Sequence, residues 1–341
     1  MTANGRPRAP LMTNTQADRV KEVARLAGRP SRLRRREFLA EGPQAVREAL
    51  RLHLTRVDAG AGGVVVDFFA TDEALARHDD IAELLVHPTA PRLRMVTPEV
   101  LAAMSSTVTP QGFIAVCRFV DTPLDEILAS GPRLVAVLVE VRDPGNAGTI
   151  IRAADAAGAD AVILTGGSVD LYNPKTVRST VGSVFHLGVV TGADVQDLPA
   201  RLRAAGLTIL AADGHGSSSL DDLQEASESR RFAGSQGDGD SRPPSSGGDD
   251  PQPPTPQPTT PWPTGEPSRS VAAASSAADD VRLEDPAAWL FGNEAQGLAD
   301  TVTAAADARV AVPIYGSAES LNVGTAATVC LYASARAQRA R

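Results

Sequence analysis

Short apolar runs alternate with segments of helical periodicity along most of this 341-residue chain, and that alternation constrains its fold more than any other feature. In the later part of the chain such runs occupy residues 134–139, 161–164, 187–190, 207–211, 288–291 and 310–312. Runs of this length are typical of strands buried on both faces, and most of the segments between them are long enough for crossover helices. The pattern predicts an α/β domain with a mostly parallel sheet over residues 134–341.

Helices in this domain are expected at residues 147–157, where Gly158 ends the helix, at 175–184, and from Ser320 onward. The alternation stops at about residues 227–280, where Pro, Ser, Gly, Asp and Thr dominate and almost nothing can be buried. Such a composition cannot offset the conformational entropy lost on ordering, so we expect a disordered insertion there.

The beginning of the chain shows a smaller pattern of the same kind, which predicts a separate α/β domain over residues 17–120. Its expected helices lie at 20–27, 45–50, 73–85 and from Pro98, and its expected strands at 38–39, 64–70, 93–96 and 114–119. Thr97 is positioned to cap the helix that begins at Pro98. Residues 1–16 are expected to be a flexible N-terminus and 121–133 a linker between the domains.

Composition argues against several classes of protein. No stretch of the sequence approaches the roughly 20 apolar residues of a membrane helix, and the N-terminus lacks the apolar core of a secretory signal. Cys117 and Cys330 fall in a predicted strand and a predicted helix, without partners spaced for a disulfide or a metal site. The glycine motifs of dinucleotide-binding and P-loop folds are missing too. We therefore expect a cytoplasmic protein with no metal and no membrane partner.

The net charge of -8 conceals an uneven distribution of charge. Arginines crowd the start of the chain, and within residues 31–36 they form a cluster that would suit phosphate contacts with RNA: Arg32, Arg34, Arg35 and Arg36. A solvated basic loop is the alternative interpretation of the same residues. Lys175 and Arg178 are further candidates to face RNA, whereas His186 and His215 have no partner at a recognisable spacing and are assigned no role.

Two motifs follow strands of the second domain. In the first, at residues 143–158, a Pro-Gly turn leads to Asn146 at the start of a helix, and Arg152 follows about a turn and a half later. In the second, at residues 290–298, Gly292 and Gly297 lie on either side of Glu294, and glycines allow a ligand to approach the backbone. The alternatives are a helix cap with a surface arginine, and a tight turn with a solvated glutamate.

A third motif, at residues 312–327, contains Ser320 and Asn322 and continues into a run of small residues that begins at Gly324. Small residues at the start of a helix predict a very close contact with other backbone, and such a contact is also the purely structural interpretation of the motif.

In this order, the three motifs resemble those of the SpoU (TrmH-like) branch of the SPOUT methyltransferases, from residue 134 to the C-terminus apart from the insertion. Residues 38–43 (FLAEGP) and 109–115 (TPQGFIA) resemble the ribosomal-protein-like substrate-binding domain that is often fused ahead of this catalytic domain.

The resemblance implies a deep C-terminal trefoil knot, although knots are otherwise almost absent from proteins. It also implies that the knot loops bind S-adenosylmethionine, chiefly through backbone groups. The positions that match are Gly292, Val312 and Leu321, with Ile314, Gly297 and Asn322 nearby. Members of the family are typically homodimers whose active site is completed at the subunit interface.

The implied reaction transfers a methyl group to a ribose 2′-hydroxyl of RNA, preferably ribosomal RNA because of the N-terminal domain. Arg152 matches the family arginine that is often proposed to activate this hydroxyl. Because guanidinium stays protonated in proteins, positioning the phosphate–ribose unit and stabilising the alkoxide is the preferred role. Asn146 and Glu294 are expected to hold Arg152 and the loops, and Ser320 and Asn322 to contact substrate or cofactor. A transfer RNA substrate, methylation of a base and a non-catalytic RNA-binding role remain as alternatives.

Overall fold

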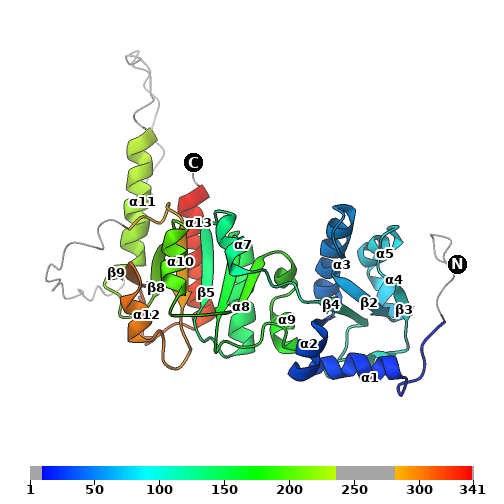
Figure 1. The fold of residues 1–341 in the computed structure, drawn as a ribbon. Helices are drawn as coiled ribbons and strands as arrows, with labels where there is room; N and C mark the ends of the chain where they lie inside the picture. The colour runs from blue at the N-terminus through cyan, green and yellow to red at the C-terminus, as the bar shows by residue number, and fades with distance from the viewer. Residues whose placement is uncertain (1–9, 236–280, 340–341) are drawn as a thin grey trace, which may run out of the picture.

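The computed structural model describes residues 10–235 and 281–339, which form two α/β units lying side by side (Figure 1). The N-terminal unit contains a four-stranded sheet of order β1-β4-β2-β3, and the second unit contains a seven-stranded sheet. Each sheet carries its own helices, so the division into two α/β units follows the alternation seen in the sequence.

In the N-terminal sheet, β1 (Glu37–Glu41), β4 (Phe113–Arg118) and β2 (Val65–Ala70) are antiparallel, and β3 (Leu93–Met95) runs parallel to β2. The helices of this unit are α1 (Asp18–Ala24), η1 (Arg25–Ala27), α2 (Arg29–Arg35), α3 (Pro43–Asp58), α4 (Asp72–Arg77), α5 (Asp79–Val86) and α6 (Pro98–Met104). The hydroxyl of Thr97 accepts from the backbone N–H of Val100 at 3.4 Å, so the predicted cap of α6 is confirmed.

The second sheet has the strand order β7-β6-β5-β10-β8-β11-β9, and every neighbouring pair in it is parallel. Its strands are β5 (Leu134–Leu138), β6 (Ala161–Thr165), β7 (Gly188–Ala193), β8 (Thr208–Ala212), β9 (Ser218–Ser219), β10 (Ala287–Phe291) and β11 (Ala308–Ala311). The predicted parallel sheet is thus confirmed.

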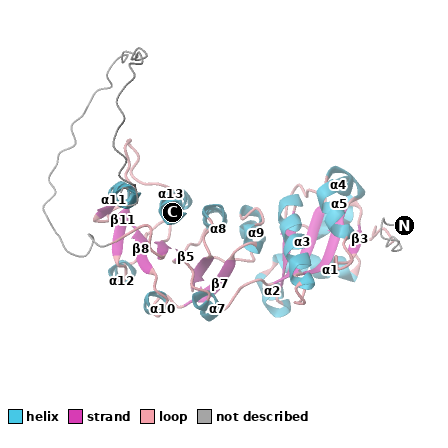
Figure 2. Ribbon diagram, turned by 90° about the horizontal axis from the view of Figure 1, so that it is seen from above, coloured by secondary structure: helices cyan, strands magenta, loops and turns pink. Residues whose placement is uncertain are grey.

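Helices cover both faces of this sheet, as Figure 2 shows from above. On one face lie α8 (Pro144–Ala157), α9 (Pro174–Ser179), α11 (Leu220–Ser235) and α13 (Val323–Arg339). On the other face lie α7 (Leu124–Ala129), α10 (Leu198–Ala204) and α12 (Asp300–Ala304). Along β5, Leu134, Ala136 and Leu138 join the core on the first face, whereas Val135 and Val137 join the core on the second. A strand covered on both sides needs an unbroken apolar run, which accounts for the sequence of β5.

The two units share a cluster of aromatic rings. The ring centroid of Tyr172 lies 3.7 Å from that of Phe119 and 4.7 Å from that of Phe38, and Phe185 lies 5.9 Å from Phe38. The Tyr172 hydroxyl donates to Asp121 at 2.7 Å and accepts from the backbone N–H of Asp121 at 2.8 Å. These contacts join the end of the first unit to the loop that precedes α9, so the units pack together through apolar and polar groups.

Several expected boundaries are wrong. The expected helix at 73–85 breaks at His78, whose ring packs against Phe113 and whose φ of -132° lies outside the helical region. The helix expected at 175–184 ends at Ser179, because Val181 and Gly182 both adopt positive φ, 54° and 100°. The final helix begins at Val323 rather than at Ser320.

Three expectations about irregular segments also need correction. The supposed linker 121–133 contains α7, whose Ile127 is buried against the sheet. The first part of the insertion expected at 227–280 is wrong, since α11 continues to Ser235; residues 236–280 lie outside the described part. In the N-terminal segment that was expected to be flexible, residues 1–9 also lie outside the described part of the structure. Met12, however, donates to the carbonyl of Met95 at 2.9 Å and accepts from the backbone N–H of Thr97 at 3.1 Å.

Candidate active site

A chain of side-chain hydrogen bonds joins the three sequence motifs. The Asn146 amide donates to the Oε1 atom of Glu294 at 3.0 Å, and its carbonyl oxygen accepts from the Asn322 amide at 3.0 Å. The Asn322 carbonyl in turn accepts from the backbone N–H of Gly324 at 2.9 Å. Asn146 therefore uses both ends of its amide, and the structure brings one residue from each of the three motifs together.

The position of Asn146 depends on how α8 begins. This helix starts after β5, where the Asp143 carboxylate accepts from the backbone N–H of Asn146 at 2.8 Å and Pro144 occupies the first helical position. The same hydrogen bond, helped by the Lys175 ammonium 3.5 Å away, lowers the pKa of Asp143 below its ordinary value. A charged cap therefore holds the first turn of α8 at the carboxyl edge of the sheet.

The loop after β10 is a tight turn that positions Glu294. The backbones of Asn293 and Gly297 bond to each other in both directions at 3.0 and 2.8 Å, and Gly297 has a φ of +67°. A Cβ atom on Gly292 would lie 2.4 Å from the Gly297 carbonyl carbon, so only glycine fits there. Asn293 also donates to the Glu140 carbonyl at 3.1 Å, a role that our sequence analysis missed. The side-chain oxygen of Asn293 accepts from the backbone N–H of Ala295, and an asparagine that forms such a local turn is the sequence signal that could have identified it.

Arg152 and Ser320 are both exposed. Arg152 lies six positions after Asn146 on α8, which corresponds to about 9 Å along the helix. Among the hydrogen bonds of the described residues, none joins Arg152 to Asn146 or to Glu294, so the expectation that those two side chains hold Arg152 is wrong. The Asn146 side chain bonds instead to Glu294 and Asn322, and Arg152 is exposed about a turn and a half further along α8.

The segment between β11 and α13 matches what a ligand bound through backbone groups requires. In the described part of the chain, no hydrogen bond between main-chain atoms involves residues 313–321. The apolar side chains of Ile314 and Leu321 are 39% and 38% exposed, and Val312 is packed against the core at the start of the segment. Unpaired backbone donors and acceptors beside exposed apolar side chains suit an adenine ring, so these residues fit S-adenosylmethionine.

The small residues at the start of α13 do lie close to another helix, although the atoms nearest Gly324 belong to a side chain rather than to the backbone that was expected. A Cβ atom on Gly324 would lie 2.9 Å from Cγ2 of Thr149 on α8. On the opposite side of α8, a Cβ atom on Gly148 would lie only 1.9 Å from the Ser179 hydroxyl. Glycines therefore let α8 lie very close to both α9 and α13.

The four arginines predicted to bind RNA separate into different environments. Arg32 is 3% exposed and donates to the carbonyls of Leu26 and Ala27 and to the Asp170 carboxylate at 2.7 Å, so its assignment to RNA is wrong. A buried guanidinium with these partners is a structural link between the two units. The other three keep some exposure. Arg35 pairs with Glu37, Arg36 pairs with Asp121 and lies over the Phe119 ring, and Arg34 is exposed.

His186 also has a position that the sequence did not reveal. Its Nδ1 atom lies 2.8 Å from the Asp155 carboxylate on α8, and its Nε2 atom lies 3.1 Å from the Glu48 carboxylate on α3. Although partial burial opposes the charged form, these two hydrogen bonds raise the pKa of His186 above its ordinary value. His186 thus bridges the two units.

A cavity of about 420 Å³ lies away from the motif loops, between α7, α10 and the end of β7. Of the predicted site residues it contains only Arg36, together with Thr122, Gly192, Asp197 and Arg201 among its other lining residues. Its mixed charges do not indicate a substrate, so the motif residues define the candidate site.

Within residues 10–235 and 281–339, no group of three His, Cys, Asp or Glu side chains is arranged to hold a metal ion. In the same ranges, no helix has the length and apolar character to span a membrane. Cys117 and Cys330 are both buried free thiols.

Comparison with known proteins gives the same division of the chain. The MRM3-like substrate binding domain matches residues 17–115, and the SpoU rRNA Methylase family matches residues 133–240 and 267–332. The chain is 30% identical over 317 residues to the 23S rRNA (guanosine(2553)-2'-O)-methyltransferase RlmP of Bacillus subtilis (strain 168), covering 92% of this chain and 94% of that protein.

Two solved structures are similar to this chain over almost its whole length. The AdoMet-bound rRNA methyltransferase from Sinorhizobium meliloti superposes with a TM-score of 0.68 at 25% identity, covering 97% of this chain and 99% of that one. The SpoU methyltransferase AviRb from Streptomyces viridochromogenes, in complex with the cofactor AdoMet, superposes with a TM-score of 0.63 at 25% identity, covering 94% of this chain and 98% of that one. With an α/β fold that matches these structures and three motifs joined in one site, the chain belongs to the SpoU rRNA methylase family and carries an MRM3-like substrate-binding domain.

Proposed function

We propose that this protein is an S-adenosylmethionine-dependent methyltransferase that modifies a ribose 2′-hydroxyl of ribosomal RNA. The observation that carries the proposal is the hydrogen-bonded chain Glu294–Asn146–Asn322, because it unites the three family motifs at the carboxyl edge of a parallel sheet. The relative RlmP is named as a 23S rRNA 2'-O-methyltransferase, which supports the substrate class, and two similar structures contain AdoMet. A ribosomal RNA substrate in turn suggests a cytoplasmic location.

When bound, S-adenosylmethionine supplies a sulfonium methyl group. The residues of the chain must then align the ribose hydroxyl with that methyl group and ease the loss of its proton. We assign to Arg152 the binding of the adjacent phosphate and the stabilisation of negative charge on the ribose oxygen, because its guanidinium is exposed and stays protonated. Asn146 and Glu294 hold the loops, and Ser320 contacts the substrate or the cofactor.

We further propose that the active form is a homodimer whose interface runs along α8 and α13. Val329 and Tyr332 of α13 are 39% and 49% exposed, and α13 packs against α8, which carries Arg152. A second copy seated on these apolar side chains would lie next to Arg152 and close the site from outside. Tyr332→Asp is expected to give monomers in sedimentation experiments and to lower methylation. A monomeric wild type would overturn the dimer.

A trefoil knot accounts for the path of the chain after β11. From β11, on the outer side of β8, the chain returns past the loop 292–298 to α13, which packs on α8 and on β10. Asn322 on this returning segment bonds to Asn146, so the segment contacts the start of α8, which also bonds to the loop after β10 through Glu294. Threading through the loop that follows β10 is the arrangement that we propose.

The direct test is transfer of labelled methyl from S-adenosylmethionine to purified ribosomal and transfer RNA, by wild type and by Arg152→Ala. We expect label in ribosomal RNA as a 2′-O-methyl nucleotide, and a fall in kcat of about 10²- to 10³-fold in the variant, as for the loss of one charge-stabilising donor. Because Arg152 is exposed, the variant should keep its melting temperature and its cofactor affinity. Label found only in transfer RNA would show that transfer RNA is the substrate, and label on a base would show that the enzyme methylates a base instead of a ribose. If the wild type does not bind the cofactor, the protein would be a non-catalytic RNA-binding protein.

A further inference from the structure

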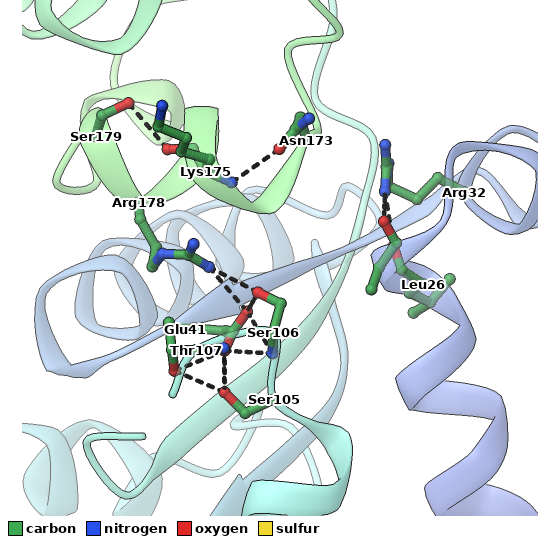
Figure 3. A network of polar contacts seen from close by, with 11 residues as sticks. Leu26, Arg32, Glu41, Ser105, Ser106, Thr107, Asn173, Lys175, Arg178 and Ser179 are labelled. Carbon is green, nitrogen blue, oxygen red and sulfur yellow. Dashed lines mark hydrogen bonds and ion pairs between the residues drawn. The ribbon is translucent and has the colours of Figure 1, made fainter. Parts of the chain in front are cut away.

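One polar cluster connects the substrate-binding unit to the catalytic unit, and the reaction described above does not use it (Figure 3). At its centre is Glu41, the last residue of β1, whose side chain is 5% exposed. The Glu41 carboxylate accepts from the hydroxyls of Ser105 and Ser106 and from the backbone N–H of Ser106 at 3.2 Å, all in the loop that follows α6. Glu41 thereby fixes the start of this loop from inside its own unit.

The catalytic unit reaches the same cluster through one side chain. Arg178 of α9 donates to the Ser106 hydroxyl at 2.7 Å and to Glu41 at 3.4 Å. Its side chain is 33% exposed, so water only partly screens these charge-assisted contacts. Arg178 therefore supplies a positive charge to a carboxylate that is buried in the other unit and otherwise bonded to neutral donors.

The same short helix is attached to the start of α8. Ser179, the neighbour of Arg178, donates to the carbonyl of Pro144 at 2.9 Å and lies against Gly148, while Lys175 lies 3.5 Å from the Asp143 cap. Asn146 belongs to this first turn of α8. Thus α9 contacts the substrate-binding unit through Arg178 and the catalytic turn through Ser179 and Lys175.

We propose that Arg178 is a positioning residue for methyl transfer, which acts through Glu41 and Ser106 to hold the substrate-binding unit at a fixed orientation to the α8 turn. RNA bound to the N-terminal unit then presents its target ribose to Asn146 and Arg152 in one geometry. Loss of Arg178 removes the contact between α9 and the loop after α6, so the units can shift at this point. The Tyr172 aromatic cluster, the Arg32–Asp170 pair and the His186 bridge still keep the units joined. A displacement of about 1 Å can lower the rate of a positioned reaction by roughly 100-fold. This inference rests on the proposed function.

The test measures orientation and activity separately. Spin labels at Glu73→Cys on α4 and His215→Cys in the loop after β8 report the distance between units. Both side chains are exposed, at 76% and 97%, and the two native cysteines are buried. We expect one narrow distance distribution in the otherwise wild-type protein and a broader one in Arg178→Ala. In the unlabelled variant, kcat at saturating RNA should fall by about 10- to 100-fold, while KM for RNA and the Kd for S-adenosylmethionine change less than about threefold.

Two further variants and one control complete the design. Ser106→Ala removes an exposed hydroxyl that accepts from Arg178, so it should broaden the distribution without unfolding the protein. Arg178→Lys keeps the charge and should restore part of kcat. Arg203→Ala removes an arginine that pairs with Asp307 inside the catalytic unit, and it should change neither measurement.

A broader distance distribution together with a lower kcat supports the inference. An unchanged distance distribution with a lower kcat overturns the inference, because Arg178 would then act on the RNA directly. A loss of affinity for S-adenosylmethionine also overturns it, because the substitution would then have damaged the catalytic unit. A wild-type protein without methylation would refute the proposed function, whereas the spin-label distances would still test the positioning by Arg178.

Discussion

The side-chain amide of Asn146 donates to Glu294, 148 residues further along the chain, and this contact joins the first turn of α8 to the loop after β10. Asn146→Asp replaces the donor with a second carboxylate, so the two charges repel and the loop moves. We expect S-adenosylmethionine to bind roughly tenfold more weakly, as for the loss of a hydrogen bond plus a like-charge contact. Calorimetric titration of the cofactor measures this.

The double variant Asn146→Asp/Glu294→Gln reverses the direction of the same hydrogen bond and serves as its control. The glutamine amide introduced at position 294 then donates to the new aspartate, which still accepts from Asn322. Cofactor affinity should return to within about threefold of wild type, because the coupling between neighbouring residues is the quantity that a double-mutant cycle isolates. Equal affinity in the single and double variants would show that this contact does not hold the loop.

Arg32 and Arg34 are expected to differ in what they stabilise. Arg32→Ala leaves the Asp170 carboxylate and two carbonyls without their buried partner, so the free energy of unfolding should fall by about 3 kcal/mol. Arg34 is exposed, so Arg34→Ala should leave stability unchanged. It should weaken RNA binding and lower the slope of log affinity against log salt by about 1. Denaturant unfolding measures the stability of both variants, and filter binding at several salt concentrations measures their affinity for RNA. Equal stability and equal RNA affinity in the two variants would contradict the different roles assigned to Arg32 and Arg34.

Gly148 is expected to tolerate no larger residue. Gly148→Ala places a Cβ atom 2.6 Å from that of Ser179 and 2.9 Å from its backbone carbonyl carbon, so α8 and α9 must separate. Overpacking of this kind costs about 1–3 kcal/mol of stability. Gly62 has open space around it, and Gly62→Ala should leave the melting temperature unchanged. A melting temperature unaffected by Gly148→Ala would mean that the two helices are not in close contact.

The His186 bridge predicts a pH dependence of stability. The carboxylates of Asp155 and Glu48 raise the folded-state pKa of His186 above its ordinary value of 6.5. Its contribution is therefore complete below the unfolded-state pKa, and it is lost as the pH rises through the folded-state pKa. The melting temperature should fall as the pH rises above about 6.5 and through the folded-state pKa of His186, and His186→Gln should reduce this slope. His215→Gln, at a side chain that is 97% exposed, is the control and should keep it.

The sequence predicted the parts of the molecule that depend on local pattern. The strands β5 and β10 are continuous apolar runs, and β6 and β8 are apolar apart from one threonine at an end of each. Gly158 ends α8 in the left-handed conformation, as expected. The association of Asn146, Glu294 and Asn322 was predicted from motif resemblance rather than from spacing. By contrast, the helix break at His78 depends on packing against Phe113, which no local pattern records. The break after Ser179 includes Gly182, where a Cβ atom would lie 2.8 Å from the Glu48 side chain of the other unit.

Side chains that act between the units were the hardest to predict. Arg32 belongs to an arginine-rich run, yet its partner Asp170 lies 138 residues away, and the partners of His186 lie on two different helices. A basic cluster or an isolated histidine looks the same in sequence whether it is buried in an interface or exposed. Only the packing of the two units distinguishes these cases.

The position of β10 has a consequence for how this protein is made. β10 lies between β5 and β8 in the sheet, but it is encoded after both of them and after residues 236–280. During translation, the nascent chain therefore exposes the edges of β5 and β8 to solvent until residue 291 has emerged from the ribosome. The N-terminal unit has all its strands by residue 118 and can fold early. The catalytic sheet can close only after β10 has been made, and premature release or truncation before that point would leave two aggregation-prone edges unpaired.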